Sequence, residues 1–289
     1  MREFKKNDLP VALTIAGSDS GGGAGIQADL LTFAAHGVFG TTAITALTAQ
    51  NPAGVSAVHP VPAAFVREQA EQVARFFKIG AAKTGMLANA EIICAVADFF
   101  EAHREIRLVL DPVMIATSGA KLIDDEAVSV LRERLIPLAS LVTPNLDEAE
   151  VLLGEKFLWR GNAETDFRDI AESAEKLAAA LGVPVLLKGG HGNGEDISDA
   201  LAFPKKTESG LGKNPGILTH KRVAETNTHG SGCTLSAAIA ANLAGDDGEN
   251  LLDSVSKAVV YVSRGISNPL AVAGDRFIAH LFQQDPPQR

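Results

Sequence analysis

The sequence contains few cysteines, few aromatic residues and no long hydrophobic run. Its two cysteines, Cys94 and Cys233, are too few for a disulfide framework or a zinc site. No apolar run approaches the roughly 20 residues that a helix needs to cross a bilayer, and residues 1–10 lack the apolar core of a signal peptide. We therefore expect a cytoplasmic protein that does not bind a membrane.

Clusters of basic residues are also missing. The formal net charge is −9, and no more than two Lys or Arg residues follow one another. Because nucleic-acid affinity depends on clustered cations, this pattern argues against a nucleic-acid partner. No repeat, linker or change in composition divides the 289 residues. We expect a single domain over 11–268, with a tail at 1–10 and a C-terminal extension of the same domain at 269–289.

Short apolar runs alternate with segments of helical periodicity along the chain. The pattern predicts an α/β fold, a three-layer α/β/α sandwich with a mostly parallel central sheet. The expected strands lie at 11–16, 38–46, 81–84, 107–110, 141–143 and 185–188, with a hairpin at 199–203 and 217–223. The expected helices lie at 26–36, 63–77, after Asn89, and at 166–181, 231–244 and 249–266.

Polar and glycine residues follow the predicted strands. Ligands of such sheets bind beyond the carboxyl ends of the strands. The residues at those ends should therefore lie together: they are 17–25, 85–86, Asp111, Asn145, Lys188 and the turn at 227–233. The polar hairpin at 192–220 is rich in Lys and Gly, and we predict a mobile flap over the ligand there.

The stretch 227–241 changes from a glycine-bearing turn to a helix of small residues. Gly230 and Gly232 let backbone N–H groups approach a ligand closely, and the N-terminus of the following helix favours an anion. Cys233 lies at this N-terminus, where the helix dipole is expected to lower the pKa of its thiol. The alternative is a glycine turn that opens a packed helix, with Cys233 as a small buried hydrophobic residue.

The sequence lacks the complete motif of three common kinds of ligand site: dinucleotide, Walker P-loop and metal. Residues 23–28 match the relaxed dinucleotide fingerprint, but no Asp or Glu lies between Asp29 and Glu68 to bind the ribose. A Walker P-loop is absent, and the seven His residues lack the spacing of metal ligands. Phosphoryl transfer on another scaffold remains, because it needs an anion site, a cation, carboxylates for Mg2+ and a base.

Each candidate for phosphoryl transfer also has a structural explanation. Asp111 before Pro112 is compatible with a simple turn. Asn145 and Glu148 have the spacing of a helix capping box, and Lys188 is compatible with a solvated residue at a strand end. Their common position at one sheet edge favours the functional interpretation.

Seven blocks of the sequence resemble the hydroxymethylpyrimidine/phosphomethylpyrimidine kinases of thiamine biosynthesis, which belong to the ribokinase-like superfamily. The resemblance covers residues 11–268 in order. The blocks are 16–30, 44–51, 83–87, 110–114, 143–149, 188–191 and 227–236.

The resemblance implies a role for each matched residue. Gln50 would hydrogen-bond the pyrimidine, and Gly17, Asp29, Met86 and Val113 would form the rest of its pocket. Asp111 and Glu148 would organise Mg2+, largely through water, while Lys188 and Asn145 would lie at the nucleotide phosphates. Gly230, Ser231 and Gly232 would form an anion hole, and Cys233 would be the catalytic base, with Asp29 the next candidate. Ser231 stands where relatives often have Thr.

The implied activity transfers the γ-phosphoryl of ATP, with Mg2+, to 4-amino-5-hydroxymethyl-2-methylpyrimidine and then to its monophosphate. We also expect a homodimer. Two alternatives stay open: a pyridoxal/pyridoxine kinase, and a non-catalytic pyrimidine-binding regulator. A pure binding protein has no need of Cys233, Lys188, Asp111 and Glu148 together, which argues against the regulator.

Overall fold

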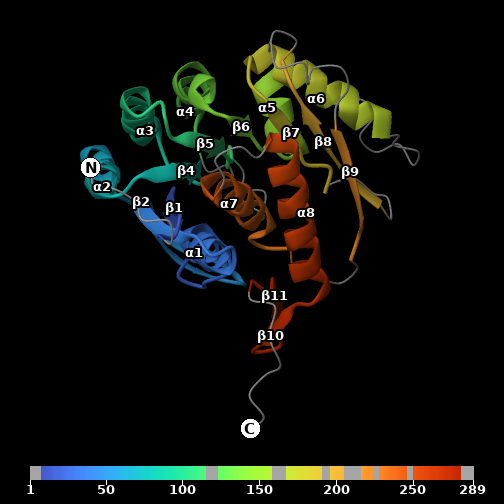
Figure 1. The fold of residues 1–289 in the computed structure, drawn as a ribbon, viewed down its shortest axis with the longest axis horizontal. Helices are drawn as coiled ribbons and strands as arrows, with labels where there is room; N and C mark the ends of the chain where they lie inside the picture. The colour runs from blue at the N-terminus through green and yellow to red at the C-terminus, as the bar shows by residue number, and fades with distance from the viewer. Residues whose placement is uncertain are drawn as a thin grey trace.

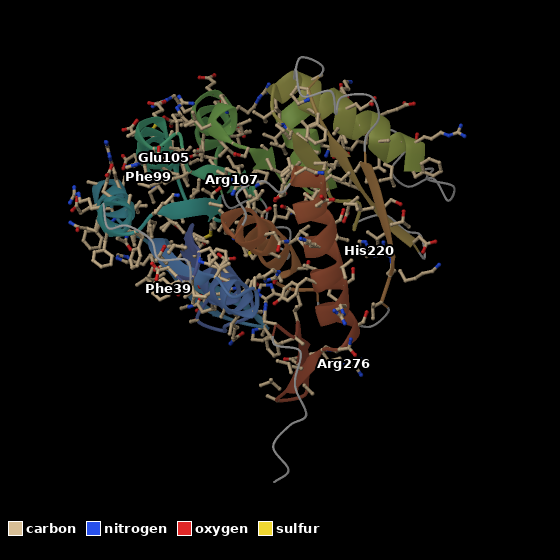
Figure 2. All side chains as sticks on the ribbon, in the orientation of Figure 1. Phe39, Phe99, Glu105, Arg107, His220 and Arg276 are labelled. Carbon is tan, nitrogen blue, oxygen red and sulfur yellow. The ribbon has the colours of Figure 1, made fainter. Side chains whose placement is uncertain are left out.

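A nine-stranded sheet forms the middle of the described part of the molecule (Figure 1). The computed structural model describes residues 8–114, 123–157, 167–190, 196–204, 216–223, 228–245 and 250–280. Neighbouring strands follow the order β3-β2-β1-β4-β5-β6-β7-β8-β9. They are β1 (Val11–Ser18), β2 (Phe39–Asn51), β3 (Gly54–Pro60), β4 (Ile79–Thr84), β5 (Arg107–Leu110), β6 (Leu141–Val142), β7 (Val185–Leu187), β8 (Asp196–Ala202) and β9 (Gly216–Lys221). Figure 2 labels Phe39 in β2 and His220 in β9, toward opposite ends of this order.

The central strands of the sheet run in one direction. β2, β1, β4, β5, β6 and β7 pair in parallel with their neighbours. The outer strands β3, β8 and β9 pair antiparallel. The prediction of a mostly parallel sheet is confirmed, and the carboxyl ends of the central strands share one edge.

Helices cover both faces of the sheet, so the predicted three layers are confirmed (Figure 1). One face carries α1 (Gly25–Ala35), α7 (Ser231–Ala244) and α8 (Leu251–Ser267). The other carries α2 (Ala63–Phe76), α3 (Ala90–Ala102), α4 (Asp125–Val130), α5 (Leu146–Leu153) and α6 (Phe167–Leu181). A π-helical turn (Leu131–Leu135) and a 3-10 turn (Ile136–Leu138) follow α4.

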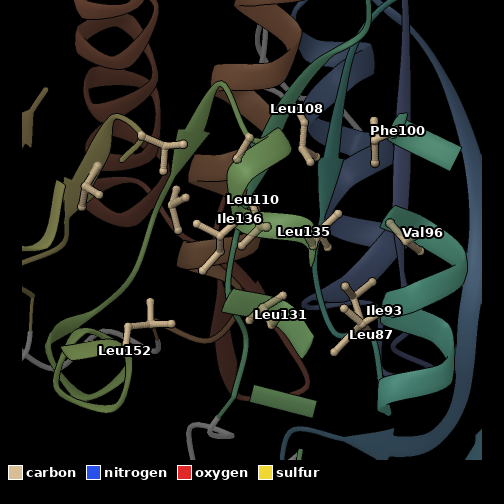
Figure 3. Close-up of a cluster of buried hydrophobic side chains, with 14 of the residues drawn as sticks. Leu87, Ile93, Val96, Phe100, Leu108, Leu110, Leu131, Leu135, Ile136 and Leu152 are labelled. Atoms are coloured by element: carbon tan, nitrogen blue, oxygen red, sulfur yellow. The ribbon is translucent and has the colours of Figure 1, made fainter. Parts of the chain in front are cut away.

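Two hydrophobic cores lie on the two sides of the sheet. Strand β5 shows why, because successive side chains of a strand point to opposite faces. Leu108 and Leu110 belong to the core under α2–α6, which Figure 3 shows with Phe100 and Leu135. Val109 belongs to the core under α7 and α8. Burial on both faces explains the uninterrupted apolar runs of the sequence.

Most expected elements are found within two residues of their expected ends. Helix α1 covers 25–35 where 26–36 was expected, and α7 covers 231–244 as expected. Asn89 caps α3, since its side chain accepts a 2.9 Å hydrogen bond from the N–H of Ile92.

Four elements were not predicted. Strand β2 continues to Asn51 and pairs with β3, whose residues are all exposed. Helix α4 was also missed, as was a small hairpin of β10 (Leu270–Val272) and β11 (Asp275–Phe277) in the C-terminal extension. Strands exposed on their whole length carry no burial pattern for sequence analysis to detect.

The predicted β8–β9 hairpin is present. Its tip at 205–215 and the residues 191–195 lie outside the described residues, so the flap stays a prediction. Among the described helices, none has an apolar stretch long enough to cross a bilayer.

Candidate active site

A cavity of about 520 Å³ opens at the carboxyl ends of the parallel strands. This is the edge at which the sequence placed the site. Twelve of the thirteen expected site residues line the cavity: Gly17, Gln50, Met86, Asp111, Val113, Asn145, Glu148, Lys188, Gly230, Ser231, Gly232 and Cys233. Residues up to 216 positions apart in sequence therefore meet in one space, as Gly17 and Cys233 show.

Asp29 is the exception, because it does not line the cavity. Its carboxylate is fully buried in α1, where it accepts hydrogen bonds from Lys83 Nζ at 2.9 and 3.0 Å and from Thr14 Oγ1 at 2.6 Å. Burial alone would lower the pKa of Lys83, but the charges of Asp29, Cys233 and Asp111 and the hydrogen bond to Asp29 together outweigh it and raise this pKa. An enclosed ion pair of this kind ties α1 to β1 and β4, and its geometry supports neither ring contact nor proton transfer by Asp29.

The N-terminus of α7 forms one wall of the cavity. Gly230 precedes the helix in the left-handed region with φ of 81°, a conformation that favours glycine. A Cβ at Gly232 would lie only 3.3 Å from Lys188 Nζ, so glycine allows the helix backbone to approach that cation. The first turn of a helix has N–H groups without partners inside the helix. These N–H groups and the ammonium group together make an anion site.

Cys233 lies in the first turn of α7 and is half-buried. Its sulfur also accepts a hydrogen bond from the N–H of Gly25, the first residue of α1. Burial raises the pKa of the Cys233 thiol, Lys83 opposes this rise, and the charges of Asp29 and Asp111 add to it. The expectation that the helix dipole lowers this pKa is therefore wrong in direction, because the desolvation of the thiol has the larger effect.

Asp111 and Lys188 form an ion pair in the floor of the cavity. Lys188 Nζ lies 2.9 Å from Asp111 Oδ1, which also accepts a 3.2 Å hydrogen bond from Thr143 Oγ1. Burial opposes the charge of Lys188, but Asp111 and Glu148 outweigh it and raise the pKa of its ammonium group. Lys188 is thus a paired cation at the cavity surface, and not the solvated residue of the alternative interpretation.

Asn145 and Glu148 make the expected capping box at the start of α5. The Glu148 N–H donates to Asn145 Oδ1 at 2.9 Å, and the Asn145 N–H donates to Glu148 Oε2 at 2.8 Å. Both residues line the cavity as well, so the structural and functional interpretations hold together. Burial raises the pKa of Glu148 to about 7, with Lys188 opposing and Asp111 adding to the rise.

Asp111 and Glu148 provide two carboxylates of the kind that Mg2+ binds. No cluster of three His, Cys, Asp or Glu side chains suited to a metal occurs in the described residues. Mg2+ does not require such a cluster, because it commonly binds through one or two carboxylates together with water and substrate phosphates. A cation would also favour the ionised form of the buried Glu148. The two carboxylates therefore fit the ion.

The opposite wall of the cavity suits a flat ring. Gly17 touches the Met86 side chain so closely that a Cβ there would lie 2.6 Å from Met86 Cε. Gln50 reaches the cavity from the end of β2, next to a β-bulge at Ala49 and Gln50. Its amide oxygen Oε1 lies 3.2 Å from Thr48 Oγ1, and its amide nitrogen Nε2 lies 3.4 Å from His229 Nε2.

Sequence analysis gave no role to several polar residues that line the cavity. Among them are Thr48, Asp19, Asp199, His220 and His229. Asp19 is inside the glycine-rich segment and His229 directly precedes Gly230, so their motifs were a signal that could have found them. Asp199 and His220 lie in the hairpin strands, whose sequence resembles no motif.

Comparison with known proteins shows the family to which this sequence is similar. A sequence profile of the family described as phosphomethylpyrimidine kinase matches residues 19–278. The hydroxymethylpyrimidine/phosphomethylpyrimidine kinase of Haemophilus influenzae is 45% identical over 269 residues, which cover 92% of this chain and 94% of that protein.

Two solved structures show the same fold. The phosphomethylpyrimidine kinase of Clostridium difficile is 38% identical with a TM-score of 0.72, covering 89% of this chain and 99% of that chain. The pyridoxal kinase of Bacillus subtilis, solved as an ADP complex, is 33% identical with a TM-score of 0.78, covering 94% and 98%. Likeness of fold alone therefore does not separate the two ring substrates.

Proposed function

The chain belongs to the phosphomethylpyrimidine kinase family, and from this premise we propose the reaction that its cavity catalyses. The γ-phosphoryl of ATP is transferred to the hydroxymethyl oxygen of 4-amino-5-hydroxymethyl-2-methylpyrimidine, and a second transfer extends the monophosphate to the diphosphate. One observation carries the proposal: Cys233, the α7 N-terminus and the Lys188–Asp111 pair line the same cavity as Gln50.

The anion site binds the transferred group. Phosphoryl transfer proceeds through a loose transition state, so positioning and charge neutralisation provide most of the catalysis. The N–H groups of Gly232 and Cys233 are at the start of α7, where the positive end of the helix dipole favours phosphate, while the Ser231 N–H donates to the carbonyl oxygen of Thr228 at 3.0 Å. Lys188 adds a full positive charge beside Gly232.

Cys233 is the group placed to accept the proton of the substrate hydroxyl at Sγ. Its raised pKa keeps the thiol mainly neutral near pH 7 in the absence of ligands. The Gly25 N–H and Lys83 favour the thiolate, whereas Asp111 disfavours it. We propose that Asp111 and Glu148 hold Mg2+, which would neutralise phosphate charge and also offset the effect of Asp111 on the thiol.

Gln50 binds the ring. A primary amide offers one donor and one acceptor side by side, which complements the N3 and 4-amino edge of an aminopyrimidine. Met86 and Val113 supply apolar contact in the same cavity. Pyridoxal kinase is a structural relative of this chain, and a pyridoxal ring lacks that edge.

An assay of ADP release tests the proposal. We expect turnover with the aminopyrimidine that depends on Mg2+, and turnover with pyridoxal at least about tenfold lower, the effect of losing roughly one hydrogen bond to the amide. The Cys94→Ala variant is a matched control, because Cys94 does not line the cavity. Absence of ring-dependent ADP release would indicate a binding protein.

We also propose a homodimer in the cytoplasm. Strand β3 is an edge strand of the sheet, and Val55 and Val58 on it are exposed while they also line the cavity. An exposed apolar edge strand is a common place for a second chain to pair. Light scattering on Val55→Lys against the wild-type chain tests this, and an unchanged mass would exclude the edge as the interface.

A further inference from the structure

Asp19, His229 and Gln50 form a chain of polar side chains along one side of the cavity. His229 Nε2 lies 3.2 Å from Asp19 Oδ2 and 3.4 Å from the Gln50 amide. Asp19 is buried and fixed, since its carboxylate also accepts hydrogen bonds from the N–H groups of Gly21 at 2.8 Å and Ala24 at 2.9 Å. The imidazole is thus held against a rigid acceptor.

His229 Nε2 faces an acceptor, the Asp19 carboxylate, and a donor, the Gln50 amide nitrogen. One ring nitrogen cannot form a hydrogen bond with both. The nitrogen Nε2 either carries one proton or accepts along one lone pair. The Asp19 carboxylate accepts hydrogen bonds, so His229 Nε2 must carry its proton toward Asp19. An amide NH2 group of Gln50 at 3.4 Å would then point a donor at a donor.

A similar mismatch of hydrogen-bond roles occurs between Thr48 and the other end of the amide. The single hydroxyl proton of Thr48 is used in a 2.8 Å hydrogen bond to the carbonyl oxygen of Ser18. Gln50 Oε1 lies 3.2 Å from the same Thr48 Oγ1, so two acceptors compete for one hydroxyl proton. Because the shorter bond to Ser18 takes that proton, Thr48 Oγ1 is best used as an acceptor toward the amide. A half-turn of the amide exchanges its oxygen and NH2 group without moving another atom. It gives Thr48 Oγ1 a donor, and it replaces the donor–donor contact at His229 with an amide oxygen that shares the Nε2 proton with Asp19.

We propose that Asp19 and His229 fix the Gln50 amide with its oxygen toward His229 and its NH2 group toward Thr48, and that this polarity selects the ring. The proposal rests on the proposed function. The amide oxygen then accepts from the 4-amino group and the NH2 group donates to N3. C5, which carries the reacting hydroxymethyl group, neighbours C4. The ring therefore presents that group toward the His229 side, where Gly230 and Cys233 follow in the chain.

A 4-oxo analogue of the substrate reverses this edge. In its lactam form N3–H is a donor and O4 is an acceptor, so the same ring position requires the opposite amide orientation. In the wild-type chain His229 and Thr48 oppose that rotation. The network should therefore discriminate between two rings of nearly the same shape.

The test compares kcat/KM for the 4-amino and 4-oxo rings in position variants. His229→Leu removes the Nε2 proton and frees the amide, so the preference for the 4-amino ring should fall about tenfold, the effect of roughly one hydrogen bond. His229→Gln places an amide donor near the same position and should keep the preference within about threefold. Thr48→Val removes the hydroxyl at the other end and should relax the preference independently.

The outcomes are distinct. If both His229→Leu and Thr48→Val lower turnover of the two rings equally and leave their ratio unchanged, His229 and Thr48 are only structural and the inference is overturned. Should His229→Leu not fold, as judged by circular dichroism, the Thr48→Val ratio alone decides. Failure of the wild-type chain to phosphorylate the 4-amino ring would refute the proposed function and not the orientation of the amide.

Discussion

At the scale of single residues, the proposed chemistry depends on a thiol between the N-termini of two helices. Cys233 belongs to the first turn of α7, and the first residue of α1 donates to its sulfur. Burial nevertheless raises the pKa of this thiol. Its place was predictable from the glycine turn before it. Its environment was not, because Lys83, Asp29 and Asp111 come from other parts of the chain.

The role of Cys233 can be tested by substitution and by pH. Cys233→Ala should lower kcat about 10²–10⁴-fold, the usual contribution of a placed base. ATP binding should survive, since the backbone N–H groups remain. Because the pKa is raised, the wild-type kcat should increase between pH 7 and 9 as the thiolate forms. Cys233→Asp should recover part of the rate and lose this increase. A near-full kcat in Cys233→Ala would make the thiol a packing residue.

Glu148 provides a second test at this scale. Its pKa of about 7 in the folded chain exceeds the ordinary value of 4.5 because of burial. The contribution of Glu148 to the unfolding free energy is therefore most favourable below pH 4.5 and is lost as the pH rises through 7. The loss amounts to about 3 kcal/mol. Urea unfolding in EDTA should show that Glu148→Gln stabilises the chain by about 2–3 kcal/mol more at pH 8 than at pH 5. An equal effect at the two pH values would contradict the raised pKa.

At the scale of elements, helix ends and strand ends determine the position of the site. The periodicity of α1, α6 and α7 and the caps at Asn89 and Asn145 are local signals, so sequence analysis found them. Strand β3 and the β10–β11 hairpin carry no such signal, because their residues are exposed and their pairing is set by distant contacts. His229 lies inside a recognised motif, but its role was missed because its partner Asp19 lies 210 residues away.

The buried pair between α1 and β4 makes a prediction about these elements. Lys83→Met should leave the Asp29 charge buried without its partner and cost about 3–5 kcal/mol of unfolding free energy. The double variant Lys83→Met/Asp29→Leu should recover most of that loss.

An exposed ion pair serves as the control for the buried one. Lys221 and Asp196 lie 2.8 Å apart on the β8–β9 hairpin, with side chains 77% and 50% exposed. Lys221→Met should change the unfolding free energy by less than about 1 kcal/mol. Equal costs for Lys83→Met and Lys221→Met in urea titrations would show that the buried pair does not stabilise the junction of α1 with the sheet.

At the scale of the whole molecule, a parallel sheet brings distant segments to one edge. The cavity lies at the ends of β1, β2, β4, β5, β6 and β7 and under the start of α7. This arrangement was predictable because the alternation of strands and helices implies it. The electrostatics of the cavity depend on burial in three dimensions and were not predictable.

Phosphorylation of the ring itself tests the central claim most directly. The wild-type chain, incubated with ATP, Mg2+ and 4-amino-5-hydroxymethyl-2-methylpyrimidine, should convert the ring to a monophosphate and then a diphosphate, followed by mass spectrometry and 31P NMR. Cys94→Ala should give the same products, and Cys233→Ala should give them about 10²–10⁴-fold more slowly. ADP release without a phosphate ester on the hydroxymethyl oxygen would contradict the account.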